Sequence, residues 1–244
     1  MNIFLAGCFE GLYQRDMTTK KIPSINTGTD TSDKSTGWRG SREVWLDAAR
    51  QVLIESGVDA VKIQPLAARL AISRTSFYWF FKDRTALLEA LLDDWEARNT
   101  GAFITACSAY AETIAEGLLN LISVYHHRNK FDPEMDFAVR AWAQGVPEVK
   151  ARLQRADVGR LDAIRGLFTR FGFDAEEADV RANTVYLTQI GYIALQVSED
   201  QVTRVGRVPA YVQTFCGTPP TSREMARFKA GLPTDEERAR KDKQ

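Results

Sequence analysis

The chain has 244 residues, with 32 basic and 32 acidic side chains, 44% hydrophobic residues and 26% charged residues. These values are ordinary for a soluble globular protein and exclude a wholly disordered, collagen-like or membrane-embedded chain. The cysteines Cys8, Cys107 and Cys216 form no CxxC pair, which indicates reduced thiols in a cytoplasmic protein. Because the formal net charge is zero, any contact with nucleic acid must come from a local basic surface.

Residues 1–37 are predicted to form a flexible N-terminal leader, because their second half is rich in Thr, Ser, Asp, Lys and Gly and has little to bury. The segment Leu5-Ala6-Gly7-Cys8 resembles a lipid-attachment box, but no Lys or Arg precedes it and its apolar part is short. An extended leader is therefore favoured, and with Met17 as an alternative start it stays open whether residues 1–16 are translated. No stretch approaches the roughly 18 uninterrupted apolar residues of a membrane helix, so no membrane partner is expected.

Four basic residues lie just ahead of the first predicted helix: Lys20, Lys21, Lys34 and Arg39. Such an arm can track DNA phosphates or enter the minor groove, and a solvated tail without a role is the alternative. At the other end, residues 233–244 are predicted to be a charged, solvated tail.

The first helical pattern begins near Ser41, which can cap a helix that ends before Gly57. Its apolar residues follow the spacing of a one-sided helix: Trp45, Ala48, Ala49, Val52 and Leu53. A short helix over Pro65–Leu70, another from Ser73 to about Phe80, and a longer one from Arg84 follow. The last carries Leu87, Leu88, Leu91, Leu92 and Trp95 inward. Short helices joined by tight turns predict a helix-turn-helix domain over residues 38–100.

The run from Ile63 to Leu88, IQPLAARLAISRTSFYWFFKDRTALL, resembles the DNA-binding domain of the tetracycline-repressor (TetR) family. The resemblance extends over roughly Ser41 to Trp95. It implies a homodimeric transcription regulator, most simply a repressor that a small molecule releases from a double-stranded DNA operator. Three positions depart from the family pattern: Ala71 stands where Gly is usual, Lys62 where a Thr or Ser cap is usual, and Arg84 where Lys is usual.

The first turn of the third helix offers hydroxyl groups and a guanidinium for base edges and phosphates. Arg74 is the best candidate for reading a guanine, because a forked donor matches both guanine acceptors. The resemblance makes Tyr78 and Lys82 phosphate contacts, whereas Trp79 can lie against DNA or pack inward. The aromatic residues Phe77, Phe80 and Phe81 are expected in the core. The full set of predicted DNA-binding residues is Arg39, Arg42, Lys62, Gln64, Ser73, Arg74, Thr75, Ser76, Tyr78, Trp79, Lys82 and Arg84.

Residues 101–232 are predicted to form a second all-α domain for effector binding and dimerisation. Its expected helices are Phe103–Tyr125, Pro133–Gln144, Pro147–Phe171, one capped by Asp174 that ends near Ser198, and a last turn or two over Pro209–Phe215. A stripe with a central glycine suggests a dimer interface, with packing inside the monomer as the alternative. That stripe consists of Val185, Thr188, Gln189, Gly191, Tyr192 and Leu195.

The family resemblance also implies a ligand pocket between these helices. Aromatic side chains dominate the candidates, which favours an apolar or aromatic effector with one or two polar groups. The predicted effector-binding residues are Phe103, Cys107, Tyr110, Tyr125, His126, Phe137, Arg140, Trp142, Tyr186 and Gln189. Arg140 can pair with an effector carboxylate or lie on a solvated helix face.

Enzyme motifs are missing from the sequence: it contains no GxSxG, GxxxxGK or GxGxxG pattern. The pair His126-His127 has no Cys, Asp or Glu four residues away, so no metal and no cofactor are expected. The preferred interpretation is a sequence-specific DNA-binding regulator that is not an enzyme. The first alternative is a ligand-binding helical protein whose DNA binding has been lost or redirected, and a lipid-anchored sensor is the second.

Overall fold

The computed structural model describes residues 40–234 of the chain. The predicted leader, Arg39 and residues 235–244 of the predicted tail lie outside these residues. The described part is built of helices and contains no strand, which confirms the all-α prediction. None of the helices in residues 40–234 is both long and apolar enough to cross a membrane.

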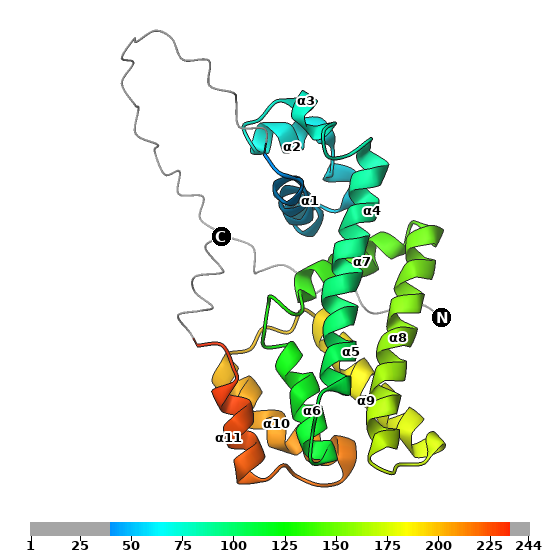
Figure 1. Ribbon diagram of the computed structural model, residues 1–244, viewed down its shortest axis with the longest axis vertical. Coiled ribbons are helices and arrows are strands. Elements are labelled where there is room, and N and C mark those ends of the chain that lie inside the picture. Colours follow the sequence, from blue (N-terminus) through cyan, green and yellow to red (C-terminus); the bar gives the residue numbers. More distant parts are fainter. Residues whose placement is uncertain (1–39, 235–244) are drawn as a thin grey trace, which may run out of the picture. The chain divides into compact units, whose positions relative to one another are not determined.

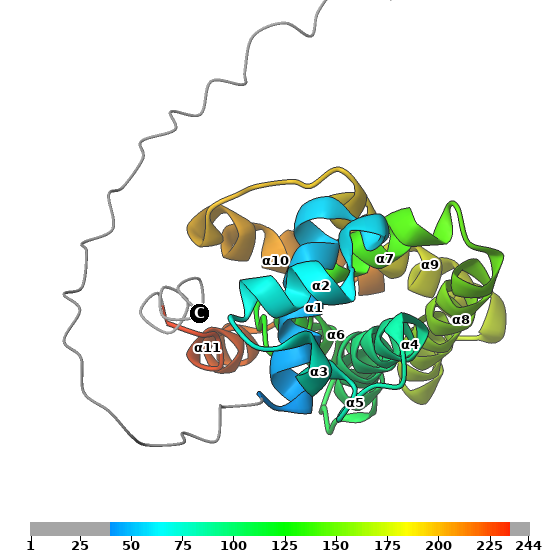
Figure 2. The ribbon, with the colours of Figure 1, turned by 90° about the horizontal axis from the view of Figure 1, so that it is seen from above.

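The first four helices form a helix-turn-helix unit, shown in blue and cyan in Figures 1 and 2. They are α1 (Arg42–Ser56), α2 (Ile63–Arg69), α3 (Arg74–Phe77) and α4 (Arg84–Trp95), with the short turn η1 (Val58–Ala60) after α1. As predicted, the hydroxyl of Ser41 caps α1 by accepting a hydrogen bond from Val44 N at 3.3 Å, and Gly57 ends the helix with φ 77°. Helix α3 is shorter than predicted, because residues 78–80 continue it only as a turn.

Seven further helices follow, after a π-helical segment η2 (Glu96–Thr100) that continues directly from α4. They are α5 (Gly101–Ser108), α6 (Ile114–Val124), α7 (Pro133–Ala143), α8 (Pro147–Arg170), α9 (Ala175–Ala194), α10 (Gln201–Cys216) and α11 (Ser222–Ala230). Helices α8 and α9 pack against each other, α5 lies against α6 and α8, and α6 contacts α10 and α11.

Two other predicted helices differ more strongly from the structure. The single helix expected over Phe103–Tyr125 is two helices, because Thr113 caps α6 by accepting a hydrogen bond from Glu116 N at 3.0 Å. The turn or two expected over Pro209–Phe215 is the sixteen-residue helix α10, with Pro209 in its interior and α11 beyond it. The prediction was wrong here because a proline costs a helix one hydrogen bond without always ending it.

Helix α2 ends in a Schellman motif, in which Ile72 N donates to Ala67 O and Ala71 N donates to Ala68 O, both at 3.1 Å. Ala71 therefore lies in the left-handed region, with φ 54°, where Gly is the usual residue. Helix α9 ends at Ala194, four residues before the predicted end near Ser198, and the same motif follows it with Gln196 at φ 49°.

The described helices enclose two hydrophobic cores. One surrounds Trp45 and Phe77, which meet edge to face at 5.2 Å between ring centroids, and it also includes residues of α7 and the first half of α8. The other lies between α5, α6 and the helices from the second half of α8 onward. The core of the helix-turn-helix unit thus continues into the second half of the chain.

Candidate functional sites

Helix α3 carries the candidate nucleic-acid interface on its exposed side. Phe77 is fully buried against α1, whereas Arg74, Thr75 and Tyr78 are exposed. The guanidinium of Arg74 lies 5.9 Å from the Tyr78 ring centroid, and its Nη2 donates to the Tyr78 hydroxyl at 3.1 Å. These two side chains therefore form one unit on the outer surface of the helix, with a cation and hydroxyl groups presented together.

The other predicted DNA-binding residues fall into two groups. Those with exposed side chains are Arg42, Lys62, Gln64, Ser73, Trp79 and Lys82. Trp79, which the sequence left undecided, has 68% of its surface exposed. Two others have internal roles: the Ser76 hydroxyl donates to Ser73 O at 2.6 Å and is buried, and Arg84 donates to Val61 O and Val58 O at 2.5 and 2.6 Å. In this structure Arg84 ties α4 to the turn before α2 through Nε and Nη2, so part of its guanidinium is used inside the fold.

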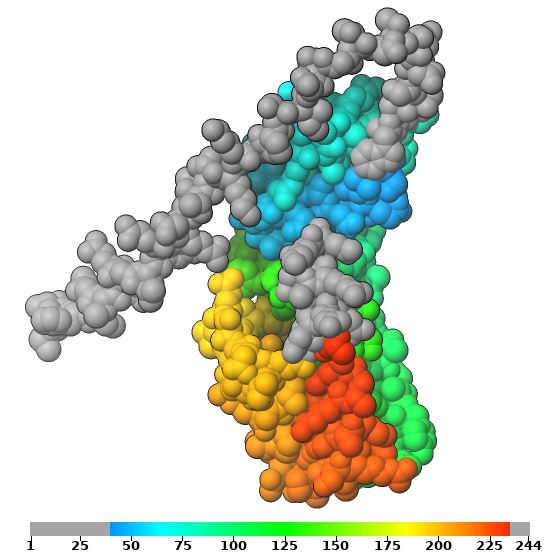
Figure 3. All heavy atoms as spheres, turned by 90° about the vertical axis from the view of Figure 1, so that its left-hand side faces the viewer, coloured from blue at the N-terminus to red at the C-terminus, as the bar shows by residue number. Residues whose placement is uncertain are grey.

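Two adjoining cavities lie between α6, α9 and α10. The narrower has a volume of about 50 Å³ and an apolar floor that includes Leu121, Val185 and Val208. The wider has a volume of about 380 Å³ and extends from the α6–α7 connection to residues 196–199. In Figure 3 the green surface of the α6–α7 region lies beside the yellow surface of α9 and the segment after it.

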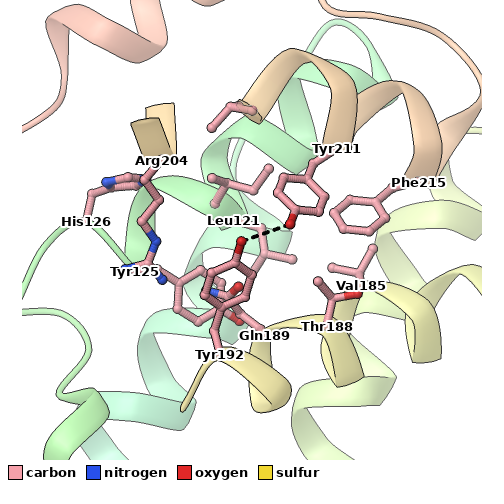
Figure 4. A pocket seen from close by; sticks show the side chains of 12 residues that line it. Leu121, Tyr125, His126, Val185, Thr188, Gln189, Tyr192, Arg204, Tyr211 and Phe215 are labelled. Atoms are coloured by element: carbon pink, nitrogen blue, oxygen red, sulfur yellow. Dashed lines mark hydrogen bonds between the residues drawn. The ribbon is translucent and has the colours of Figure 1, made fainter. Parts of the chain in front are cut away.

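The two cavities share four residues: Tyr125, Gln189, Tyr192 and Arg204. Figure 4 shows the hydroxyls of Tyr192 and Tyr211 meeting between α9 and α10, where their oxygens lie 2.9 Å apart. Tyr125, His126 and Arg204 lie on one side of this pocket, and Val185 and Phe215 lie on the other. The shared residues make the cavities two parts of one candidate binding site.

Of the predicted effector residues, Tyr125, His126, Phe137 and Gln189 line these cavities. The other six do not: Phe103 and Cys107 are buried in the second core, Trp142 packs against the first core, and Tyr110 is 82% exposed. Burial raises the pKa of the Cys107 thiol to about 12, so it stays protonated. Arg140 and Tyr186 belong to a polar network between α7, α8 and α9. Sequence reasoning missed Tyr192, Arg204 and Tyr211 as pocket residues.

That network centres on two fully buried side chains, Asp136 and Arg160, whose charged atoms lie 3.0 Å apart. Asp136 also accepts hydrogen bonds from Trp95 Nε1 and Arg140 Nε, both at 2.9 Å. Burial acts to raise the pKa of Asp136, but the guanidiniums of Arg160 and Arg140 outweigh it and hold that pKa below its usual value. Asp136 is therefore ionised.

Arg140 and Tyr186 meet at Asp157, an acidic residue of α8. Arg140 pairs with the Asp157 carboxylate at 2.7 Å, and the Tyr186 hydroxyl donates to the same carboxylate at 2.6 Å. Burial is the main cause that raises the pKa of Tyr186. Both side chains are thus used inside the fold, which is the physical reason that the structure does not place them in the cavity.

Most of the stripe predicted for dimerisation faces the interior of the monomer, but its last residue, Leu195, is 78% exposed. Val185 is buried, and Thr188, Gln189 and Tyr192 line the cavity. A different side of α9 exposes apolar residues, Val180 at 60% and Leu187 at 59%, and α8 exposes Val158 at 55%. This exposed apolar face of α8 and α9 is the candidate surface for contact with a second copy of the chain.

Residues 46–91 match the family model of the bacterial regulatory proteins of the tetR family. Over 61 residues the chain is 39% identical to the class D tetracycline repressor protein of Escherichia coli and to the class H protein of Photobacterium damsela subsp. piscicida. Each match covers 25% of this chain and 28% of the relative, so the likeness is confined to one segment.

The fold is also similar to a crystal structure from Rhodococcus sp. that is described as a TetR-family transcriptional regulator. The TM-score is 0.53 at 16% sequence identity, and the alignment covers 72% of this chain and 98% of that one. At this identity the likeness concerns the fold alone. It extends beyond the helix-turn-helix unit into the second half of the chain.

Proposed function

We propose that this chain, whose residues 46–91 match the model of the tetR family of bacterial regulatory proteins, is a homodimeric transcription regulator. Its α3 helices bind an operator in double-stranded DNA, and a small molecule in the second half of the chain releases it. The observation that carries the proposal is the exposed face of α3, where Arg74, Thr75 and Tyr78 project from a helix fixed by the buried Phe77. A short helix of this kind fits the major groove and reads base edges with its first turn.

The roles proposed along this face differ in kind. Arg74 reads a base, because its forked donors match the two acceptors of guanine. Lys62, Tyr78 and Lys82 contact phosphates and fix the position of α3 on the duplex. Because the chain as a whole has no net charge, the affinity for DNA comes from the basic residues on and near α3.

Two copies are proposed to associate through the exposed apolar face of α8 and α9 that includes Val158, Val180 and Leu187. Burying such side chains is favourable, and a two-fold axis places two α3 helices on one operator. Dimeric helix-turn-helix proteins bind half-sites about 34 Å apart, or multiples of that spacing. A two-fold symmetric operator is therefore expected.

Gel retardation with DNA from upstream of the gene, followed by footprinting, tests the proposal. Arg74→Ala should weaken binding to the specific site by about 1–3 kcal/mol and relax the preference at one base pair. Lys82→Ala should weaken specific and random DNA alike and reduce the salt slope by about one unit. Arg223→Ala, which changes an exposed arginine of α11, is the matched control. Failure to bind any DNA would instead favour a ligand-binding protein with lost or redirected DNA binding.

A further inference from the structure

We infer that the adjoining cavities form one site for an amphipathic organic acid, a carboxylate carried on an aromatic body, with Arg204 as the residue that binds the carboxylate. The inference rests on the proposed function, because it names the chemical class of the small molecule. Four observations carry the inference: the charged residues around the wider cavity, the hydrogen bonds of the polar groups, the aromatic walls of both cavities, and the small apolar floor of the narrower cavity.

The charges around the wider cavity are paired except at one residue. Arg128 pairs with Glu134 at 2.9 Å, and Glu199 pairs with Arg207. Within residues 40–234, no carboxylate lies within salt-bridge distance of Arg204, whose guanidinium instead lies 5.1 Å from the ring centroid of Tyr192. Among the charged residues that line the wider cavity, Arg204 is thus the one without an ion pair within residues 40–234, and an anionic group of a ligand would supply its partner.

Because Arg204 is half-buried, it suits anion binding better than a fully exposed arginine does. Its side chain is half-buried and lies on the same side of the pocket as Tyr125. A guanidinium binds a carboxylate with two parallel hydrogen bonds, and such bonds strengthen where water is partly excluded. Gln189, which lines both cavities, makes no side-chain hydrogen bond to any described residue. Its amide is available as a second donor beside Arg204.

The remaining walls fit an aromatic body of limited width. The side chains of Tyr125 and Tyr192 line both cavities and offer ring surfaces for stacking or edge contacts. The wider cavity, at about 380 Å³, lies in the range of small-molecule sites. The narrower one, at about 50 Å³, is much smaller and has an apolar floor that includes Leu121, Val185 and Val208. A short apolar substituent on the ring fits this floor.

Calorimetric titration of the full-length protein without DNA tests the inference with three probes of one shape: para-ethylbenzoate, para-ethylbenzamide and para-ethylbenzylamine. The benzoate should bind more tightly than the neutral amide, and the amine should not bind. Arg204→Met should raise the Kd of the benzoate about ten-fold or more, because hydrogen bonds to charged groups are worth that much, and leave the Kd of the amide unchanged. Arg204→Lys should give an intermediate value, and Arg223→Met should match the wild type.

Three outcomes would overturn the inference: tighter binding of the amide or the amine, an unchanged Kd of the benzoate in Arg204→Met, or no binding of the benzoate at millimolar concentration. Thermal melting of each variant shows whether it is folded, and the lysine variant keeps the test decisive if the methionine variant is not. Gel retardation separates the two proposals. If DNA is retarded and the benzoate does not bind, the ligand class alone is wrong. If the benzoate binds through Arg204 and no DNA is retarded, the regulatory function alone is wrong.

Discussion

Replacing Ala71 by Gly should make the protein more stable, which is unusual for a change that removes a side-chain atom. Ala71 has φ 54° at the end of α2 and an exposed side chain, so Gly at this position loses no packing. An L-residue in the left-handed region costs about 1–2 kcal/mol relative to its preferred conformations. Glycine loses more conformational entropy on folding, which costs about 0.5–1 kcal/mol. The difference predicts a gain of about 0.5–1 kcal/mol for Ala71→Gly.

Urea denaturation followed by circular dichroism, at fixed protein concentration, measures this gain as a higher midpoint with an unchanged slope. Ala68→Gly is the matched control, because Ala68 is equally exposed in the same helix and has ordinary helical geometry. It should lower the stability by about 1 kcal/mol. If Ala71→Gly lowers the midpoint as Ala68→Gly does, the reasoning from backbone conformation is refuted. The structure supplies a natural parallel at Gly172, which ends α8 with φ 89°.

Two other changes test the local energetics. Lys62 stands at the N-cap of α2 and makes no capping hydrogen bond. Lys62→Ser should therefore raise the free energy of unfolding by about 0.5–2 kcal/mol in the same urea assay. An unchanged free energy would show that the new hydroxyl does not cap the helix. Asp136→Asn leaves Arg160 buried without its nearest counter-ion and should cost about 3–5 kcal/mol at neutral pH. Because the folded-state pKa of Asp136 lies below the usual 3.8, its contribution is complete above pH 3.8 and is lost as the pH falls through the folded-state pKa. The gap between wild type and variant should narrow there, and a constant gap would show that the carboxylate is not ionised.

The first four helices could be predicted because their signals are local. The apolar stripe of α1 and the cap at Ser41 specify a helix without reference to the rest of the chain. A local signal for the break between α5 and α6 was also present, since Thr113 and Glu116 form the Ser/Thr-x-x-Glu pattern of a helix start. The alanine-rich run across the break concealed it. Helix α10 was concealed in the same way by Pro209, although Val205, Val208, Val212 and Phe215 follow a helical spacing.

The candidate sites depend on contacts that no local pattern contains. Arg84 looks like a basic residue at a helix start, and only the approach of Val58 and Val61 shows that backbone carbonyls receive its hydrogen bonds. Gln189 belongs to α9 and Arg204 to α10, so whether they line one cavity depends on how these two helices pack. Arg140 is likewise paired by Asp157, seventeen residues away.

The continuation of the first core into α7 and α8 limits how this protein can be recombined with its relatives. Met135, Ala138 and Val139 share a core with Trp45 and Leu87, and Arg50 of α1 pairs with Asp132 at the start of α7 at 2.7 Å. A chimera that joins α1–α4 of a relative to this chain at residue 100 would set these side chains against a surface with different neighbours. The DNA specificity proposed for α3 is therefore better exchanged by grafting the exposed positions of this helix alone, which leaves the shared core intact.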